Sequence, residues 1–183
     1  MQFDTTVNRW NTVPNTARIN ATNPCGEYNF LDDSSCNLAS LNLLLFRRPD
    51  GTFDIEGYKA AVRTTAIAQD LEFDNSSYPT AAVARNSHRL RPLGQGYANL
   101  GALIMSFGLP YDSDEARAIA AALTALQTGT VYETSADLAA RVGAFKEFEK
   151  NREPMLQVMT LHRGALKNIN RTKIPRSLEN ILD

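Results

Sequence analysis

A short polar stretch near the start of the chain, "NPCGEYNF" at residues 23–30, carries three side chains that could do chemistry. The residue before a proline favours extended backbone, and alternate residues of an extended segment point to the same side. We therefore expect Asn23, Cys25 and Glu27 to present an amide, a thiol and a carboxylate on one face. Gly26 has no side chain, so a ligand or another backbone segment could approach closely there. The pattern indicates sulfur chemistry on a polar substrate, with Cys25 as nucleophile or hydrogen-atom donor and Glu27 as general base.

The same residues also admit a structural interpretation, in which Cys25 is a buried cysteine beside a surface glutamate. The other cysteine, Cys36, is close enough in sequence for a hairpin or bend to bring the two sulfurs together as a catalytic or redox disulfide, although unpaired structural cysteines are commoner. The spacing of these cysteines and of His88 and His162 does not match the closely spaced pairs of structural zinc sites, so no metal site is expected. We expect His162 in a helix core and His88 on a solvated basic face.

Composition limits the class of protein. The 183 residues are 43% hydrophobic and 21% charged, as in a globular protein with one core, so one domain is the default expectation. A formal net charge of -1 favours no nucleic-acid surface, and any nucleotide is expected as a small ligand. No apolar run is long enough to cross a bilayer, and residues 1–10 lack the pattern of a signal peptide. We expect a cytoplasmic protein without a membrane partner.

The elements that must position the reactive residues are a loop-and-strand region followed by helices. Residues 1–30 have little helical periodicity, and their Asn, Thr and Pro residues are typical of turns between short extended pieces. Residues 34–46 become apolar, which fits a short helix, a buried strand, or one leading into the other. Loops hold reactive groups only when a rigid framework fixes them. We therefore expect this chain to be part of something larger.

Helical patterns dominate residues 51–170. Asp54 is expected to cap a helix that runs to about Leu71, and a short helix follows at residues 81–90. The inner face of the first helix is expected to carry Ile55, Tyr58, Val62, Ala66 and Leu71. The stretch "LGQGYANLGALIMSFG" at residues 93–108 is interpreted as one helix rich in small residues. Its glycines do not have the spacing of a dinucleotide-binding loop, so close helix packing explains them better.

Two further helices complete the prediction. Asp112 and Glu115 resemble a capping box at the start of a helical pattern that reaches Gly143, as one long helix or two nearly collinear ones. Pro154 suits the first turn of a last helix. The tail, residues 171–183, is expected to be ordered only against something else.

Three stretches of the chain closely resemble the adenosylcobalamin-dependent (class II) ribonucleotide reductases: "INATNPCGEYNFLDDSSCNLASLNL", "RPLGQGYANLGALIMSFGLPYDSDEARA" and "NREPML". The likeness extends from "FDTTVNRW" to about "LHR". It implies an α/β fold in which residues 1–183 form part of one catalytic domain, a segment of a ten-stranded α/β barrel. Residues 1–50 would supply the active-site loop and strand region, residues 51–170 mostly helices, and residues 171–183 a tail that the resemblance does not place.

The resemblance also implies a role for each candidate site residue. Cys25 matches the cysteine that becomes a thiyl radical and removes the 3' hydrogen of the ribose. Glu27 matches the carboxylate that takes the proton of the 3' hydroxyl as the 2' hydroxyl leaves as water. Asn23 matches the amide that hydrogen-bonds the substrate hydroxyls. Cys36 matches one member of a redox-active cysteine pair that ends as a disulfide, with its partner outside this chain.

The implied function is that of an enzyme segment that reduces ribonucleotides to 2'-deoxyribonucleotides for DNA synthesis. Its cofactor would be adenosylcobalamin, bound mainly by segments outside this chain and by residues that the sequence does not identify. The implied partners are a ribonucleoside diphosphate or triphosphate, a thioredoxin-like or other dithiol reductant, and the remainder of the reductase, without which the segment is expected to be inactive.

Two alternatives and one departure accompany this interpretation. The chain could be a non-catalytic remnant or complementation module of a split reductase, or a segment of the large subunit of an iron-dependent class I reductase. Where the family is expected to carry a histidine and a cysteine, this sequence has Asn11 and Val13.

Overall fold

The computed structural model describes residues 3–178 and 180–182, which form two compact units. The first unit combines the described residues up to Asn37 with Gln69–Gly94 and Leu138–Ala165, and the second combines Leu38–Ala68, Gln95–Asp137 and the described residues from Leu166 onward. Residues 179 and 183 of the expected tail, and Met1, lie outside the described residues. None of the described helices is both long and apolar enough to span a membrane.

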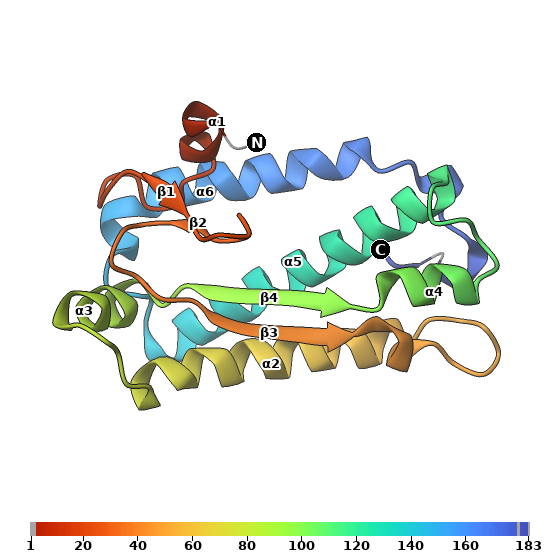
Figure 1. Cartoon of the computed structure of the whole chain (residues 1–183), viewed down its shortest axis with the longest axis horizontal. Helices are drawn as coiled ribbons and strands as arrows, with labels where there is room; N and C mark the ends of the chain where they lie inside the picture. The colour runs from red at the N-terminus through yellow and green to blue at the C-terminus, as the bar shows by residue number, and fades with distance from the viewer. Residues whose placement is uncertain (1–2, 179, 183) are drawn as a thin grey trace. The chain divides into compact units, whose positions relative to one another are not determined.

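The first unit is built from helices around a short hairpin (Figure 1). Its complete elements are α1 (Asp4–Arg9), β1 (Ala21–Thr22), β2 (Asn29–Phe30), α3 (Ala81–Leu90) and α6 (Phe148–Ala165). A small apolar core forms where the loops of the first thirty residues meet α3. Its buried members are Val13, Ile19, Leu31 and Leu90.

Helix α1 was not expected from the sequence, and a distant contact explains it. The Asn8 side chain accepts a hydrogen bond from the Ile19 N–H and donates one to the Ile19 carbonyl, both at 3.0 Å. Asn8 also donates to the Asp4 carbonyl one turn earlier, at 3.1 Å. A helix this short is marginal by itself. The bonds to Ile19 supply stabilisation that no local sequence pattern reveals.

The second unit contains most of the strand pair β3 (Asn37–Asn42) and β4 (Leu93–Ala98). Figure 1 shows both strands running in the same direction. The helices are α2 (Ile55–Asn75), α4 (Leu100–Ser106) and α5 (Asp114–Val142). The last residues of α2 and of α5 belong to the first unit. Short 3-10 turns lie at Leu43–Phe46, Leu166–Asn168, Arg171–Lys173 and Arg176–Leu178.

The core of the second unit includes part of the tail. Leu178 and Ile181 are buried in the same apolar cluster as Tyr58, Leu103 and Leu123. These tail residues are therefore ordered against other segments of the second unit, which cover their apolar side chains.

The glycine-rich stretch that was interpreted as one helix is a strand followed by a helix. Gly94 and Gly96 lie in β4, where their carbonyls accept hydrogen bonds from the side chains of Gln69 and Gln127, each at 3.1 Å. A β carbon on Gly96 would lie 3.4 Å from the Ser40 hydroxyl of β3, so glycine permits a close approach here. Glycine is a poor helix former, and the glutamine contacts favour the extended alternative.

Helix boundaries also differ from the expected ones. Helix α2 continues to Asn75 and leaves Leu71 exposed, although Tyr58, Val62 and Ala66 are buried as predicted. Helix α5 is one continuous helix as far as Val142. Its cap is Ser113, whose hydroxyl accepts from the Ala116 N–H at 3.1 Å, and not the predicted capping box.

Helix α6 begins at Phe148, so Pro154 lies inside it and not in its first turn. A proline cannot donate to the carbonyl four residues earlier. That carbonyl, on Lys150, instead accepts a hydrogen bond from the Asn15 side chain at 2.8 Å. The contact with Asn15 satisfies the group that the proline leaves without a helical partner.

The mixture of helices and strands agrees with the predicted α/β class. The described residues contain two two-stranded sheets, β1–β2 and β3–β4, and do not by themselves form a ten-stranded barrel. The assignment of residues 1–183 to one barrel domain, with boundaries at residues 50 and 170, stays a prediction.

Candidate active site

The candidate site lies on the loop of the antiparallel β1–β2 hairpin. The loop turns because the Gly26 N–H donates to the Asn23 carbonyl at 3.1 Å. Pro24 occupies the second position of this turn, which its fixed φ suits, and Gly26 has a φ of 83°. The predicted extended stretch is therefore wrong beyond Pro24, because a proline restricts the residue before it and not those after it. Cys25 lies within the turn, between Pro24 and Gly26.

The Asn23 side chain holds the loop closed. Its Oδ1 atom accepts hydrogen bonds from the N–H groups of Gly26 and Tyr28, at 3.0 and 3.1 Å. The backbone N–H of Asn23 donates to the Tyr28 carbonyl at 3.3 Å. Since the oxygen end of the amide is engaged by the loop, the Nδ2 atom is the part of Asn23 that can donate to a ligand.

Cys25 and Glu27 are both exposed, and Cys25 is a free thiol. The fixed turn places a sulfur and a carboxylate, two residues apart, at the surface of one small loop. An exposed thiol can meet an external reactant, whereas a buried structural cysteine cannot. The interpretation of Cys25 as a buried residue is therefore wrong.

Cys36, the second cysteine, is half-buried directly before β3 and is also a free thiol. Burial, and after it the negative charge of Glu27, raise the pKa of its thiol to about 11. Glu27 is therefore near enough to act electrostatically on the Cys36 thiol. Cys36 is therefore protonated at neutral pH. It does not form a disulfide with Cys25 in this structure.

Tyr28 is a site residue that the sequence analysis missed. Its hydroxyl forms a 2.8 Å hydrogen bond with the Ser34 hydroxyl and donates to the Ser35 carbonyl at 3.1 Å. Burial raises the pKa of the phenol above its ordinary value. The available signal was a tyrosine directly after Glu27 in a polar loop, where a buried ring would need a partner for its hydroxyl.

A pair of amides fixes the strand that follows Cys36. Asn37 Nδ2 donates to the Gln69 carbonyl at 2.9 Å, and Gln69 Nε2 donates to the Asn37 carbonyl at 2.8 Å. The same Nε2 reaches the Gly94 carbonyl of β4 at 3.1 Å. Gln69 is buried, so these bonds are shielded from water. They fix the position of the backbone directly after Cys36.

The two histidines lie beside other residues of the first unit. The His162 ring lies 5.0 Å from the Trp10 ring, and burial lowers the pKa of the imidazole. His88 Nδ1 lies 3.7 Å from a carboxylate oxygen of Asp74. Among the described residues, no group of three or more His, Cys, Asp or Glu side chains is arranged to hold a metal ion.

The two positions that depart from the resembled family are structural here. The Asn11 side chain accepts from the Val13 N–H at 2.9 Å and donates to the Ala17 carbonyl at 3.0 Å. Val13 is buried in the apolar core of the first unit. Both residues therefore stabilise the fold beside the hairpin and carry no reactive group.

Comparison with known protein families shows which family this chain belongs to. The family model "Ribonucleotide reductase, barrel domain" matches residues 1–177. This chain belongs to that family. The match includes the hairpin, both cysteines and the β3–β4 pair.

Curated relatives of this reductase segment are much longer proteins. A "Vitamin B12-dependent ribonucleotide reductase" from Rhodopirellula baltica is 56% identical over 170 residues, which cover 93% of this chain and 16% of that protein. The protein of the same name from Agrobacterium fabrum is 49% identical, over 90% of this chain and 13% of its own length. A "Vitamin B12-dependent ribonucleoside-diphosphate reductase" from Mycobacterium tuberculosis is 36% identical, over 82% of this chain and 22% of its own length.

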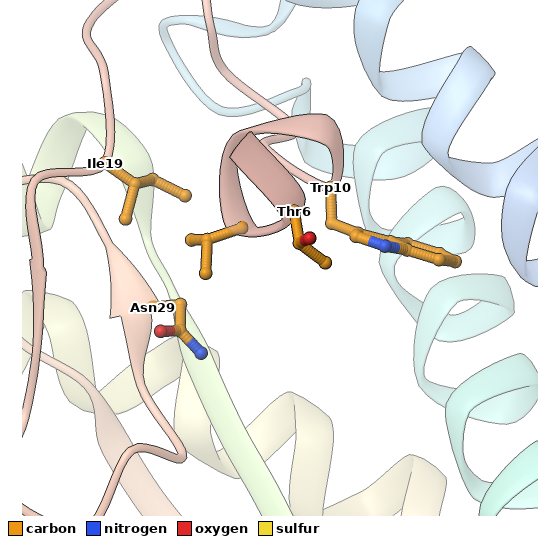
Figure 2. Close-up of a pocket in the computed structure, with 5 residues that line it drawn as sticks. Thr6, Trp10, Ile19 and Asn29 are labelled. Atoms are coloured by element: carbon orange, nitrogen blue, oxygen red, sulfur yellow. The ribbon is translucent and has the colours of Figure 1, made fainter. Parts of the chain in front are cut away.

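A pocket beside the hairpin tests whether the described residues of the reductase segment could enclose the cofactor of these relatives. Figure 2 shows Thr6 of α1, Trp10 directly after it, Ile19 and Asn29, which line a pocket with a volume of about 210 Å³. Pockets for drug-sized ligands have roughly 300–1,000 Å³, and a cobalamin is larger still. The pocket does not fit the cofactor, so we assign no residue of this chain to cobalamin binding.

Proposed function

We propose that the β1–β2 hairpin is the hydrogen-abstracting element of a cobalamin-dependent ribonucleotide reductase that makes 2'-deoxyribonucleotides for DNA synthesis. The observation that carries the proposal is an exposed free thiol, Cys25, on a turn held by Asn23, with Glu27 in the same loop, where its charge helps to raise the pKa of the Cys36 thiol. The relatives named above carry this activity in their names. Ribonucleotide reduction needs these groups at one place.

In the proposed reaction each residue has a separate task. The Cys25 thiyl takes the 3' hydrogen of the ribose, which leaves a carbon radical and a restored thiol. Glu27 accepts the proton of the 3' hydroxyl and returns it when that hydroxyl re-forms. The 2' hydroxyl departs as water with one proton from the cysteine pair, whose other proton goes to C2'. Asn23 Nδ2 donates to the substrate hydroxyls. Cys36 and a second cysteine give two electrons and end as a disulfide, and Cys25 then returns a hydrogen atom to C3'.

The cofactor and reductant follow from this scheme. When bound, adenosylcobalamin supplies the radical chemistry, while the protein supplies position and exclusion of water. The proposed partners are a ribonucleoside diphosphate or triphosphate, a dithiol protein that reduces the disulfide, and the rest of the reductase. Because the cycle needs reduced thiols, we propose a cytoplasmic location.

We also propose that the chain forms part of the ten-stranded barrel of such an enzyme. A sheet of two parallel strands is normally buried on both faces and extended by further strands. Leu38 on β3 and Leu45 just after it are 67% and 79% exposed, so large apolar side chains beside this strand pair lack cover. Additional strands and helices of the barrel would provide it.

A chimera can test the function. In it, this chain replaces the matching segment of the Rhodopirellula baltica protein, and deoxynucleotide formation is measured with added adenosylcobalamin and a dithiol. We expect Cys25→Ser to abolish turnover and Glu27→Gln to slow it by about 10²- to 10⁴-fold, the usual contribution of a general base. Glu56→Gln, at an exposed glutamate of α2, is the matched control and should leave turnover unchanged.

Three outcomes would contradict the proposal. One is turnover in the Cys25→Ser chimera at the rate of the unsubstituted chimera. Another is an unsubstituted chimera that folds and binds cobalamin yet forms no product, which favours a non-catalytic module. A need for a second radical-generating subunit in place of cobalamin would instead favour a class I reductase.

A further inference from the structure

Tyr28 connects the two halves of the candidate site. Its backbone N–H and carbonyl are both bonded to Asn23, in the loop that carries Cys25. Its hydroxyl is bonded to Ser34 and Ser35, immediately before Cys36. Along the chain, Tyr28 is separated from Cys36 by β2 and a further turn. The hydroxyl bonds bypass this stretch and join the Cys25 loop directly to the residues before Cys36.

We propose that Tyr28 is a positioning residue that holds the Cys36 segment against the loop that carries Cys25 and Glu27, so that the proton acceptor and one redox cysteine of the reductase stay together. The proposal rests on the function proposed above, because that function gives Cys36 its redox role. The positioning itself is a property of the fold and can be measured without turnover. Tyr28 has no proposed contact with substrate.

Two features of the site support this role. The Tyr28 hydroxyl has two partners on adjacent residues, which fixes both the position and the direction of the backbone leading into Cys36. From the other side, the bonds between Asn37 and Gln69 fix the backbone directly after Cys36. Cys36 is therefore held by contacts on both flanks, and Tyr28 is the one that joins it to the Cys25 loop.

The reactivity of the Cys36 thiol reports the arrangement. Its half-burial and the nearby Glu27 carboxylate keep it protonated, which makes it a slow nucleophile. If the Cys36 segment is released, its thiol becomes more exposed and moves away from the carboxylate. A return from about 11 to an ordinary pKa raises the thiolate fraction at pH 8 by roughly 100-fold, and the lower nucleophilicity of a less basic thiolate reduces the gain in rate to about 10-fold.

The test uses Tyr28→Phe in the chimera, which keeps the ring and removes both hydroxyl bonds. After reduction, the rate of Cys36 alkylation by iodoacetamide at pH 8 is measured by mass spectrometry of the peptide that carries it. We expect Cys36 to react about 10-fold faster than in the unsubstituted chimera. Tyr111→Phe, at an exposed tyrosine, is the matched control and should leave the rate unchanged.

A folded Tyr28→Phe chimera whose Cys36 reacts within about 2-fold of the unsubstituted rate would overturn the proposal. That result would mean that Tyr28 acts only through the packing of its ring, which phenylalanine retains, and not through its hydroxyl bonds. If Tyr28→Phe does not fold, Ser34→Ala removes one of the two hydroxyl partners and should give a smaller increase in the alkylation rate of Cys36. An unchanged rate in Ser34→Ala would also contradict the proposal. Alkylation requires no radical chemistry. Failure of the proposed function would appear in the turnover assay, whereas failure of the positioning role of Tyr28 would appear in the alkylation assay, so the two results can be told apart.

Discussion

Asn23 offers the sharpest test of how the loop is built, because the two ends of its amide have different proposed tasks. Oδ1 accepts the N–H groups of Gly26 and Tyr28, whereas Nδ2 is proposed to donate to substrate. Asn23→Ala removes both ends. Asn23→Asp keeps an acceptor, whose hydrogen bonds become charge-assisted, and removes only the donor. The two substitutions therefore separate holding the loop from binding the substrate.

The expected magnitudes follow from the hydrogen bonds. Gly26 N–H also donates to the Asn23 carbonyl, so it retains a partner in Asn23→Ala. For the Tyr28 N–H, the Asn23 side chain is the acceptor that the structure shows, and Tyr28 is half-buried. Loss of the acceptor of a buried donor costs about 1–3 kcal/mol, or roughly 5- to 150-fold in a local opening equilibrium. Tyr28 should lose more protection than Gly26.

Hydrogen exchange of the Gly26 and Tyr28 amides in the chimera is the assay, with deoxynucleotide formation measured in parallel. In Asn23→Ala we expect Tyr28 to exchange at least about 5-fold faster and turnover to be lost. In Asn23→Asp we expect Tyr28 exchange that is no faster than in the unsubstituted chimera, because the charge-assisted bonds are at least as strong, with turnover still lost. Unchanged Tyr28 exchange in Asn23→Ala would refute the loop-holding role, and full turnover in Asn23→Asp would refute the donor role.

Two further predictions concern the scaffold. Leu123→Ala, at a fully buried core position, should lower the free energy of unfolding by about 2–5 kcal/mol in urea titrations, while the exposed Leu45→Ala changes it by less than about 0.5 kcal/mol; equal effects would contradict the described core. Hydrogen bonds from Arg91 lower the pKa of the Asp74 carboxyl in the folded state, so this pair contributes stability above the ordinary carboxyl pKa of about 3.9 and loses it as the pH falls through the folded value. The stability difference between the unsubstituted chain and Arg91→Gln should therefore be largest above about pH 4 and shrink in acid, as thermal melting across pH can check, and a difference that grows in acid would oppose this assignment.

Much of the helical scaffold could be predicted from the sequence. The helix at Ala81–Leu90 was predicted with its bounds, and the buried positions Tyr58, Val62 and Ala66 of α2 followed from their spacing. These features depend on helical periodicity, which is local information. The pattern that ends near Gly143 likewise belongs to one helix, α5.

Other elements depended on contacts that the sequence does not display. Gly94 and Gly96 were placed in a helix, but side-chain amides from Gln69 and Gln127 hold them in a strand. The start of α6 before Pro154 requires an acceptor to be satisfied from a distant part of the chain. In each case a hydrogen bond between residues far apart in sequence outweighed local preference.

For the candidate site, the sequence by itself determined the reactive residue types and their order: an amide, a thiol and a carboxylate at Asn23, Cys25 and Glu27, with a second thiol at Cys36. The tertiary structure decided how they meet. The Asn23 side chain closes a turn, so Cys25 does not lie in the extended segment assumed for the three side chains, and the Tyr28 hydroxyl bonds to the backbone that leads into Cys36. The physical reason is that residue chemistry is fixed along the chain, whereas proximity depends on hydrogen bonds and burial that exist only after folding.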